Sequence, residues 1–256
     1  MTSKHLFEFD KSFNRPIVGT DEAGRGPAAG GVYAAAVEFE KVTEGLIKDL
    51  SILNDSKKLT AKKRESIFDL IKNNTRNQII CVEVEEIEKI NILNASLKAM
   101  NIACTNVIDD VIKLNGLTPH PALRATLSHK GRGEETTMLD HSYMHSTSHK
   151  EQGENVLVLV DGNKLIKNFG YEQQFVIKGD SKSASIAAAS ILAKVSRDRY
   201  MQQLHEEFPM YNWAKNAGYL TKEHLDAIDK YGLCKYHRPS FLKKHFLKQK
   251  TEVSIS

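Results

Sequence analysis

Seven residues, Asp21-Glu22-Ala23-Gly24-Arg25-Gly26-Pro27, organise the whole sequence. An apolar pair, Ile17-Val18, precedes them, and a second apolar run at 32–37 follows the glycines. The pattern predicts a strand that ends in two adjacent carboxylates, a tight glycine-rich turn and a second strand. Because neighbouring side chains in a strand point to opposite faces, Asp21 and Glu22 can approach one ion only where the strand ends.

Two neighbouring carboxylates repel each other unless a cation lies between them, and hard oxygen ligands suit Mg²⁺ or Mn²⁺. A solvated acidic turn is the alternative for a bare Asp-Glu pair. A dinucleotide-binding loop is excluded on two grounds. Pro27 stands where such a turn would open a helix, and the two carboxylates would repel a pyrophosphate.

The composition is that of an ordinary globular protein. The chain has 256 residues, 41% of them hydrophobic and 27% charged, which suits one large domain or one domain with a small appendage. The net charge is only +4, but basic residues gather at 57–64 and 235–250. Two basic clusters beside an acidic site indicate a polyanion bound over metal ions, although such clusters are also common on solvated surfaces.

The sequence gives no sign of a disulfide framework, a zinc site or a membrane segment. The three cysteines lie far apart and form no Cys-x-x-Cys pair. The N-terminus lacks an apolar core of signal-peptide length, and no segment approaches the ~20 apolar residues of a membrane span. We therefore expect a cytoplasmic protein without membrane contact.

Periodicity predicts the remaining elements. These are a helix from an N-cap at Thr60 to about Lys72, a strand at 78–84, a helix at about 91–114, strands at 156–160 and 175–177, and a helix at 183–205. Between Thr118 and Glu154 no period is sustained, and Ser, Thr and Gly are frequent. This segment is predicted to be a disordered insertion.

Two further carboxylates join the first pair. The apolar run at 156–160 ends in Asp161, and open α/β sheets collect ligands at the carboxyl ends of their strands. Ile191, Val195 and Asp198 share one helical stripe, which predicts that Asp198 faces the sheet. A buried aspartate needs a cation or an arginine partner, and both remain open. If all four converge, they form a cage for two divalent ions that activate a water and stabilise the leaving oxygen of a phosphodiester.

The residues at 21–27 also match the glycine turn of the bacterial ribonucleases HII. Further matches occur in family order at Leu53–Leu59, Leu93–Leu97, Val160–Asn163, Lys178–Asp180, Ser185–Asp198 and Gly218–Tyr219. Together they extend from Pro16 to Phe241, so the chain resembles the type 2 ribonucleases H over most of its length.

The resemblance implies a ribonuclease H-like α/β fold, a mixed five-stranded sheet flanked by helices, with a small helical C-terminal extension. Residues 1–15 would form an N-terminal tail. Residues 16–211 would form the catalytic domain, interrupted by the insertion at 118–154. Residues 212–256 would supply a helical substrate-binding part and a basic tail.

The resemblance also implies an enzyme that hydrolyses the RNA strand of RNA/DNA hybrids. It would also incise 5′ to single ribonucleotides embedded in duplex DNA, leaving 3′-hydroxyl and 5′-phosphate ends. Two Mg²⁺ or Mn²⁺ ions would be bound by Asp21, Glu22, Asp161 and Asp198. Such an enzyme, expected to be a monomer, would remove primers and misincorporated ribonucleotides.

The resemblance assigns further residues to the substrate. The backbone of Gly24, Arg25 and Gly26 would contact the 2′-hydroxyl of a ribonucleotide, since glycines let the backbone approach closely and this hydroxyl distinguishes RNA from DNA. Tyr219 would stack on the neighbouring deoxyribose. The phosphate contacts would come from Asn54, Lys57, Lys58, Lys182 and Ser185.

Leu220 and Pro239 depart from the family pattern, which commonly has a second glycine after the tyrosine and a basic residue near 239. Two other functions remain open. One is a hybrid-binding protein without hydrolysis, which a metal-dependent nicking assay would detect. The other is a metal-dependent nuclease of the same fold, such as an integrase or resolvase. The Gly-Arg-Gly turn disfavours that reading, because enzymes acting only on DNA have no 2′-hydroxyl to recognise.

Overall fold

The computed structural model describes residues 3–53, 59–114 and 155–253. Its centre is one five-stranded sheet in the order β3-β2-β1-β4-β5. The strands are β1 Ile17–Ala23, β2 Val32–Glu38, β3 Arg76–Val82, β4 Leu157–Asp161 and β5 Gln173–Val176. β1 pairs antiparallel with β2, and β2 with β3, whereas β1–β4 and β4–β5 are parallel. The predicted mixed five-stranded sheet is confirmed.

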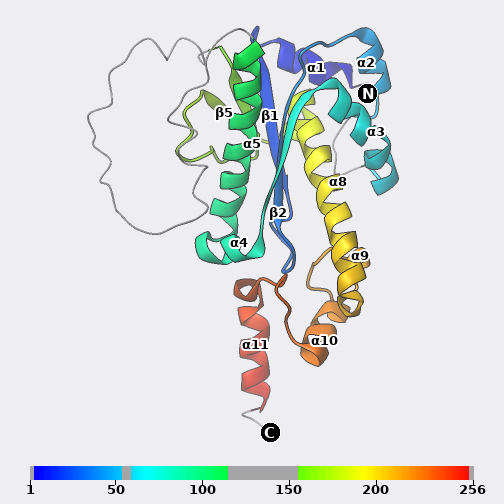
Figure 1. Cartoon of the computed structure of the whole chain (residues 1–256), viewed down its shortest axis with the longest axis vertical. Coiled ribbons are helices and arrows are strands. Elements are labelled where there is room, and N and C mark those ends of the chain that lie inside the picture. Colours follow the sequence, from blue (N-terminus) through cyan, green and yellow to red (C-terminus); the bar gives the residue numbers. More distant parts are fainter. Residues whose placement is uncertain (1–2, 54–58, 115–154, 254–256) are drawn as a thin grey trace, which may run out of the picture.

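Helices cover both faces of the sheet, with α5 on one side and α8 on the other (Figure 1). The helices are α1 Lys4–Lys11, α2 Glu44–Asp49, α3 Ala61–Asn74, α4 Val84–Ile90, α5 Ile92–Leu114, α8 Ala184–Glu207, α9 Trp213–Asn216, α10 Lys222–Tyr231 and α11 Pro239–Val253. Two short 3₁₀ turns, η1 Gly179–Ser181 and η2 Pro209–Tyr211, flank α8.

The apolar alternation of β2 explains this layering. Ala34 and Ala36 pack in the α5 core, and Ala35 and Val37 pack in the α8 core. Since successive side chains of a strand point to opposite faces, a fully apolar strand needs a helix on each side. α8 approaches β1 so closely that a Cβ on Gly19 would lie 2.3 Å from the backbone nitrogen of Ile186.

Capping residues fix where the long helices begin. The Thr60 hydroxyl accepts a hydrogen bond from the Lys63 N–H, which confirms the predicted start of α3. Ser183 caps α8 in the same way. The strand expected at 78–84 ends earlier, at Val82, because Val84 begins α4.

Residues 4–11 form helix α1, within the segment 1–15 that the sequence predicted as a tail. Leu6 and Phe7 are buried in the core beside α8. The Asp10 carboxylate accepts a hydrogen bond of 2.8 Å from the Ser185 N–H in the first turn of α8. The N-terminal segment is therefore part of the packed fold, because it satisfies a donor at the start of a buried helix.

The C-terminal part is helical, as predicted, and it packs on the far end of α8. Tyr211, Trp213 and Leu242 share a core with Met201 and Leu204 of α8. Whether 212–256 forms a separate unit remains a prediction. The insertion predicted at 118–154 lies outside the described residues. Within the described ranges, no helix has the length and apolar character that crossing a bilayer would require.

Candidate active site

Three carboxylates meet where β1 and β4 end. The strands are parallel neighbours with Thr20 opposite Val160, so Asp21 and Asp161 leave the same edge of the sheet. Asp21 is only 4% exposed. Burial, together with the charges of Glu22 and Asp161, raises the pKa of Asp21 well above its usual range. We call Asp21, Glu22 and Asp161 the strand-end cluster.

Each carboxylate of the strand-end cluster is oriented by its own partner. Oδ1 of Asp21 accepts the Glu22 N–H at 2.7 Å, and Oδ1 of Asp161 accepts the Gly179 N–H at 2.6 Å. Oε1 of Glu22 lies 3.1 Å from Nη1 of Arg25. The Ser190 side chain of α8 also hydrogen-bonds Asp21. Backbone and side-chain contacts therefore orient each carboxylate of the cluster separately.

A cleft of about 140 Å³ opens beside the cluster, between the strand ends and α5. Glu22 and Asp161 line it together with Arg25, Asn163 and Lys164. Carboxylates thus share the cleft with two cations. That combination suits a phosphodiester bound over metal ions, because each charge on the ligand then meets an opposite charge.

The donors of the strand-end cluster fit a hard divalent cation. All three are carboxylates, and in the described part of the chain neither Asp21 nor Asp161 forms an ion pair. A cation would remove the repulsion by Glu22 and Asp161 that adds to burial in raising the pKa of Asp21. The described residues hold no group of three or more side chains already arranged as metal ligands, so the predicted cage is not preformed.

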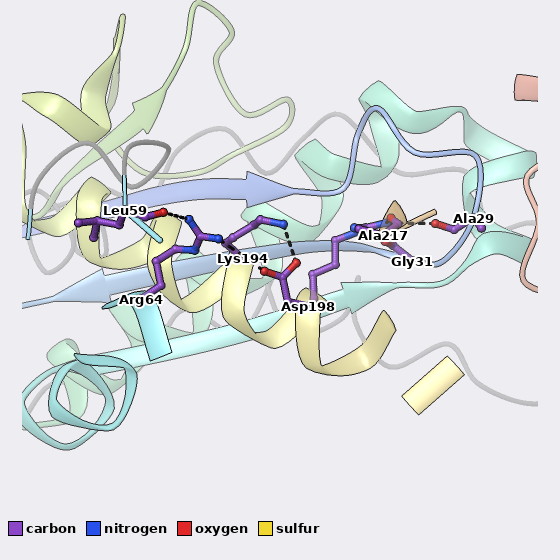
Figure 2. Close-up of polar contacts among 8 residues, drawn as sticks. Ala29, Gly31, Leu59, Arg64, Lys194, Asp198 and Ala217 are labelled. Atoms are coloured by element: carbon purple, nitrogen blue, oxygen red, sulfur yellow. Dashed lines mark hydrogen bonds and ion pairs between the residues drawn. The ribbon is translucent and has the colours of Figure 1, made fainter. Parts of the chain in front are cut away.

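Asp198 does not lie in the strand-end cluster, and the prediction that it faces the sheet is wrong. Its Oδ1 lies 2.5 Å from Nζ of Lys194, and its Oδ2 lies 3.8 Å from Nη2 of Arg64 (Figure 2). We call Arg64, Lys194 and Asp198 the ion-pair cluster. Ser190, which contacts Asp21, precedes Asp198 by eight residues, or about 12 Å of helix. The sequence left open whether a metal ion or an arginine neutralises Asp198. The structure shows an arginine, Arg64, together with Lys194.

The residue that takes the inward position on this part of α8 is Arg197. It is 1% exposed, whereas the Asp198 side chain is 34% exposed. At this end of the helix, α8 still packs on β2, where the Tyr200 and Tyr33 rings lie 5.5 Å apart, and it also meets the turn after β1. The guanidinium of Arg197 bonds backbone carbonyls there. The apolar stripe therefore no longer marks the buried face at this end of the helix.

Asp180 lies beside the strand-end cluster, although no helical or strand period pointed to it. It sits in the turn η1 and is buried. The residue before it, Gly179, donates its N–H to Asp161. The only sequence signal was the matching segment Lys178–Asp180, since a three-residue turn has no period from which a facing direction can be predicted.

The predicted ribose-reading residues come together. A Cβ on Gly26 would lie 3.2 Å from Cε1 of Tyr219, so the ring borders the turn. Tyr219 is 52% exposed, which leaves its ring available to a ligand. Leu220 does not disturb this contact. Pro239 is the first residue of α11, a position where proline is well tolerated.

The residues predicted to contact phosphates do not come together in the described part of the structure as the ribose-reading residues do. Ser185 is buried and its N–H donates to Asp10, which disfavours a phosphate at this position. A carboxylate at this helix start also repels an anion. Lys182 is exposed, and its contact with a phosphate remains a prediction. Asn54, Lys57 and Lys58 lie outside the described residues.

Comparison with known proteins supports the same family. The family model described as Ribonuclease HII matches residues 18–123 and 140–249. A ribonuclease HII from Caldicellulosiruptor bescii is 41% identical over 232 residues, covering 90% of this chain and 87% of the relative. The chain belongs to the ribonuclease HII family. Ribonuclease HII enzymes are type 2 ribonucleases H, so membership makes the chain an enzyme with ribonuclease H activity on RNA/DNA.

Solved structures support the fold of a ribonuclease HII. A structure of the PCNA:RNase HII complex from Archaeoglobus fulgidus matches with a TM-score of 0.57 and 20% identity, covering 87% of this chain and 93% of that one. A structure of Bst-RNase HIII in complex with Mn²⁺ matches with a TM-score of 0.53 and 15% identity, covering 90% and 65%. The family model passes over residues 124–139, which fall inside the predicted insertion.

Proposed function

We propose that the chain cleaves the RNA strand of RNA/DNA hybrids and incises 5′ to a single ribonucleotide in duplex DNA. The products would carry 3′-hydroxyl and 5′-phosphate ends. One observation carries the proposal beyond family membership. The turn that contains Gly26 borders the Tyr219 ring and directly follows the strand-end cluster in sequence. A ribose-reading element thus adjoins the carboxylates expected to act on the phosphodiester.

Ribose recognition would use the backbone of the turn. In the described part of the chain, the N–H groups of Arg25 and Gly26 make no hydrogen bond to the backbone. They are therefore available to a 2′-hydroxyl oxygen, the group that distinguishes RNA from DNA at one nucleotide. Tyr219 would stack on the adjoining sugar, which must be a deoxyribose where the ribonucleotide is embedded in DNA.

We further propose that two Mg²⁺ or Mn²⁺ ions are held by Asp21, Glu22 and Asp161, with Asp180 as the fourth carboxylate in place of Asp198. Asp180 is buried beside Asp161, whereas Asp198 is neutralised by two cations. When bound, the ions would activate a water and stabilise the charge on the leaving oxygen. The Mn²⁺ bound by Bst-RNase HIII, a protein of the same fold, supports this choice of ion.

The protein's own groups would orient these carboxylates. The Gly179 N–H aims Asp161, and Arg25 holds Glu22 at the mouth of the cleft. Lys164 lines the same cleft and would contact a phosphate. We also propose phosphate contacts by Lys182, Asn54, Lys57 and Lys58. The protein would act as a monomer in the cytoplasm, where RNA primers and misincorporated ribonucleotides arise.

A nicking assay tests the proposal. Three end-labelled duplexes are compared: an RNA/DNA hybrid, a DNA duplex with one ribonucleotide, and the same duplex in DNA alone. With Mg²⁺ or Mn²⁺ we expect cleavage of the first two, with the nick 5′ to the single ribonucleotide and a 3′-hydroxyl that a polymerase extends. EDTA should abolish both. Cleavage of the hybrid alone would refute the proposed incision, and cleavage of the all-DNA duplex would refute ribose recognition.

A further inference from the structure

Arg238, the residue before α11, lies beneath the turn after β1. It is 0% exposed. Its Nη1 donates to the carbonyls of Gly24 and Pro27, both at 2.8 Å. Its Nε and Nη2 donate to the carbonyl of Gly30 at 2.8 and 2.5 Å. One guanidinium therefore ties together both ends of the turn.

Arg197 reaches the same turn from α8. Its Nη2 donates to the carbonyls of Ala29 and Ala217, both at 3.1 Å, and its Nε lies 3.4 Å from the carbonyl of Gly31. Figure 2 shows Ala29, Gly31 and Ala217 gathered at this point. Ala217 precedes Tyr219 by two residues, so Arg197 links the turn to the segment that carries the tyrosine.

The partners of these two guanidiniums are unusual for buried charges. Across the described ranges, neither arginine forms an ion pair with a carboxylate, and their hydrogen bonds go to backbone carbonyls. Burying two like charges beside neutral partners is costly, and apolar residues often stabilise a fold as well as buried charges do. Fold stability alone is therefore a weak reason for two arginines at this place.

The geometry of the turn explains why Arg197 and Arg238 are buried there. Carbonyls that face inward toward the guanidiniums leave the Arg25 and Gly26 N–H groups for a ligand, and the rigid planar fork of arginine can hold several carbonyls at once. A Cβ on Gly24 would lie 2.2 Å from Nε of Arg197, so the guanidinium is packed directly against the turn. Ala28 adds a second link, donating its N–H to the carbonyl of Gly218 at 2.9 Å.

We infer that Arg197 and Arg238 are positioning residues for ribose recognition: they hold the turn with its N–H groups toward the substrate and fix its distance from Tyr219. Neither arginine touches the substrate. The inference rests on the proposed reading of the 2′-hydroxyl, and it adds the residues that make this reading selective.

Lysine tests the inference, because it keeps the charge but loses the fork. Arg197→Lys and Arg238→Lys are compared with Arg199→Lys. Arg199 lies on the same helix but contacts Glu65 and Phe68, away from the turn. For each variant, kcat and KM are measured on the single-ribonucleotide duplex and on the RNA/DNA hybrid. All measurements are made well below the melting temperature of every variant.

We expect kcat on the single-ribonucleotide duplex to fall roughly 10- to 100-fold for the two buried positions, the scale of a misplaced binding group. The hybrid should lose less, because its many 2′-hydroxyls allow other registers. Arg199→Lys should keep the parent ratio between the two substrates. Equal losses on both substrates, an unchanged ratio, or failure of both lysine variants to fold would show that the arginines are only structural. If one variant does not fold, the other decides.

Tyr219→Ala separates this inference from the proposed function. The quantity compared is the cleavage rate on the single-ribonucleotide duplex divided by the rate on the hybrid. If the parent cleaves both substrates, and Tyr219→Ala lowers this ratio while the lysine variants do not, the arginine inference fails. The proposed recognition of the ribose is then kept. If the parent does not cleave the single-ribonucleotide duplex, the proposed function fails first.

Discussion

Two aspartates near α8 have opposite surroundings. Asp21, in the strand-end cluster, is buried among other carboxylates, and its pKa is raised. Asp198, in the ion-pair cluster, lies half-exposed between Lys194 and Arg64. A carboxylate surrounded by negative charge attracts a metal ion, whereas one that already has two cations does not need one. The charges around an aspartate, more than its presence near a helix, indicate its role.

The ion-pair cluster also differs from the strand-end cluster in what it connects, as the contacts of Arg64 show. Its Nη1 donates to the carbonyl of Leu59 at 2.5 Å, so the cluster joins α3 and α8 to the residue that precedes the Thr60 cap (Figure 2). The strand-end cluster, by contrast, faces a cleft. One cluster fastens elements of the fold together, and the other presents charge to a ligand.

The largest difference should appear when Asp21, Asp180 and the ion-paired Asp198 are each exchanged for asparagine. Asp21→Asn and Asp180→Asn should lower cleavage by more than about 100-fold, since even residues that only support metal ligands cost 10- to 100-fold. Asp198→Asn should keep activity within about 10-fold and change stability by no more than about 1 kcal/mol, because its ion pairs are partly exposed. Nicking rates and calorimetric Mn²⁺ titrations of the three variants measure this.

The Mn²⁺ titration decides between the two fourth-ligand candidates. Loss of Mn²⁺ affinity in Asp198→Asn, with normal affinity in Asp180→Asn, would restore the ligand set predicted from sequence. It would also contradict the contrast between the clusters.

A smaller effect should appear in substrate choice. Gly26→Ala would press a methyl group toward the Tyr219 ring, and Tyr219→Ala would remove a stacking surface worth about 1–3 kcal/mol, or roughly 5- to 150-fold. Both should reduce cleavage of the single-ribonucleotide duplex more than cleavage of the hybrid. Lys194→Ala in the ion-pair cluster should change both substrates by the same factor. A selective loss in Lys194→Ala would show that the two clusters belong to one substrate site.

The last effect concerns stability and leaves the cleavage reaction aside; it involves a buried neutral pair behind Tyr219. Nδ1 of His224 lies 2.9 Å from the Tyr219 carbonyl, so it donates there, and its Nε2 accepts from Trp213 and from His237. Burial lowers the pKa of His224, and burial with the neighbouring His224 lowers the pKa of His237 to about 4. Neutral imidazoles here contrast with the charged groups of both clusters.

Because the folded-state pKa of His237 is depressed, the unfolded chain binds more protons between pH 4 and its ordinary value near 6.5. Stability should therefore fall as the pH drops through this window, by roughly 3 kcal/mol in all. His237→Gln should lack this share of the pH dependence. Urea unfolding at several pH values measures the difference, and parallel curves for parent and variant would show that folding leaves the pKa of His237 unchanged.

Much of the site followed from the sequence because its parts are local. Asp21 and Glu22 lie near the end of an apolar strand, Asp161 ends another, and Thr60 is an N-cap that the structure confirms. Strand direction alone brings the two strand ends to one edge of the sheet. The proximity of Gly26 and Tyr219 came only from the family resemblance, since nothing in the spacing of these residues implies it.

The tertiary structure decided what depends on neighbours distant in the sequence. Helical periodicity placed Asp198 on the stripe of Ile191 and Val195, but in the structure the neighbouring Arg197 faces the protein. Ser185 was expected to bind phosphate, but a helix from the N-terminal segment brings Asp10 to its N–H.

The sequence by itself determined the strands, the long helices and the acidic strand ends, because these follow from periods and caps within a few residues. Only the tertiary structure placed Asp180 beside Asp161 and brought Arg197 and Arg238 under one turn. Each of these placements depends on which segments become neighbours when the chain packs. A local pattern sets the direction of a side chain relative to its own element, but the charge that the side chain meets belongs to another element.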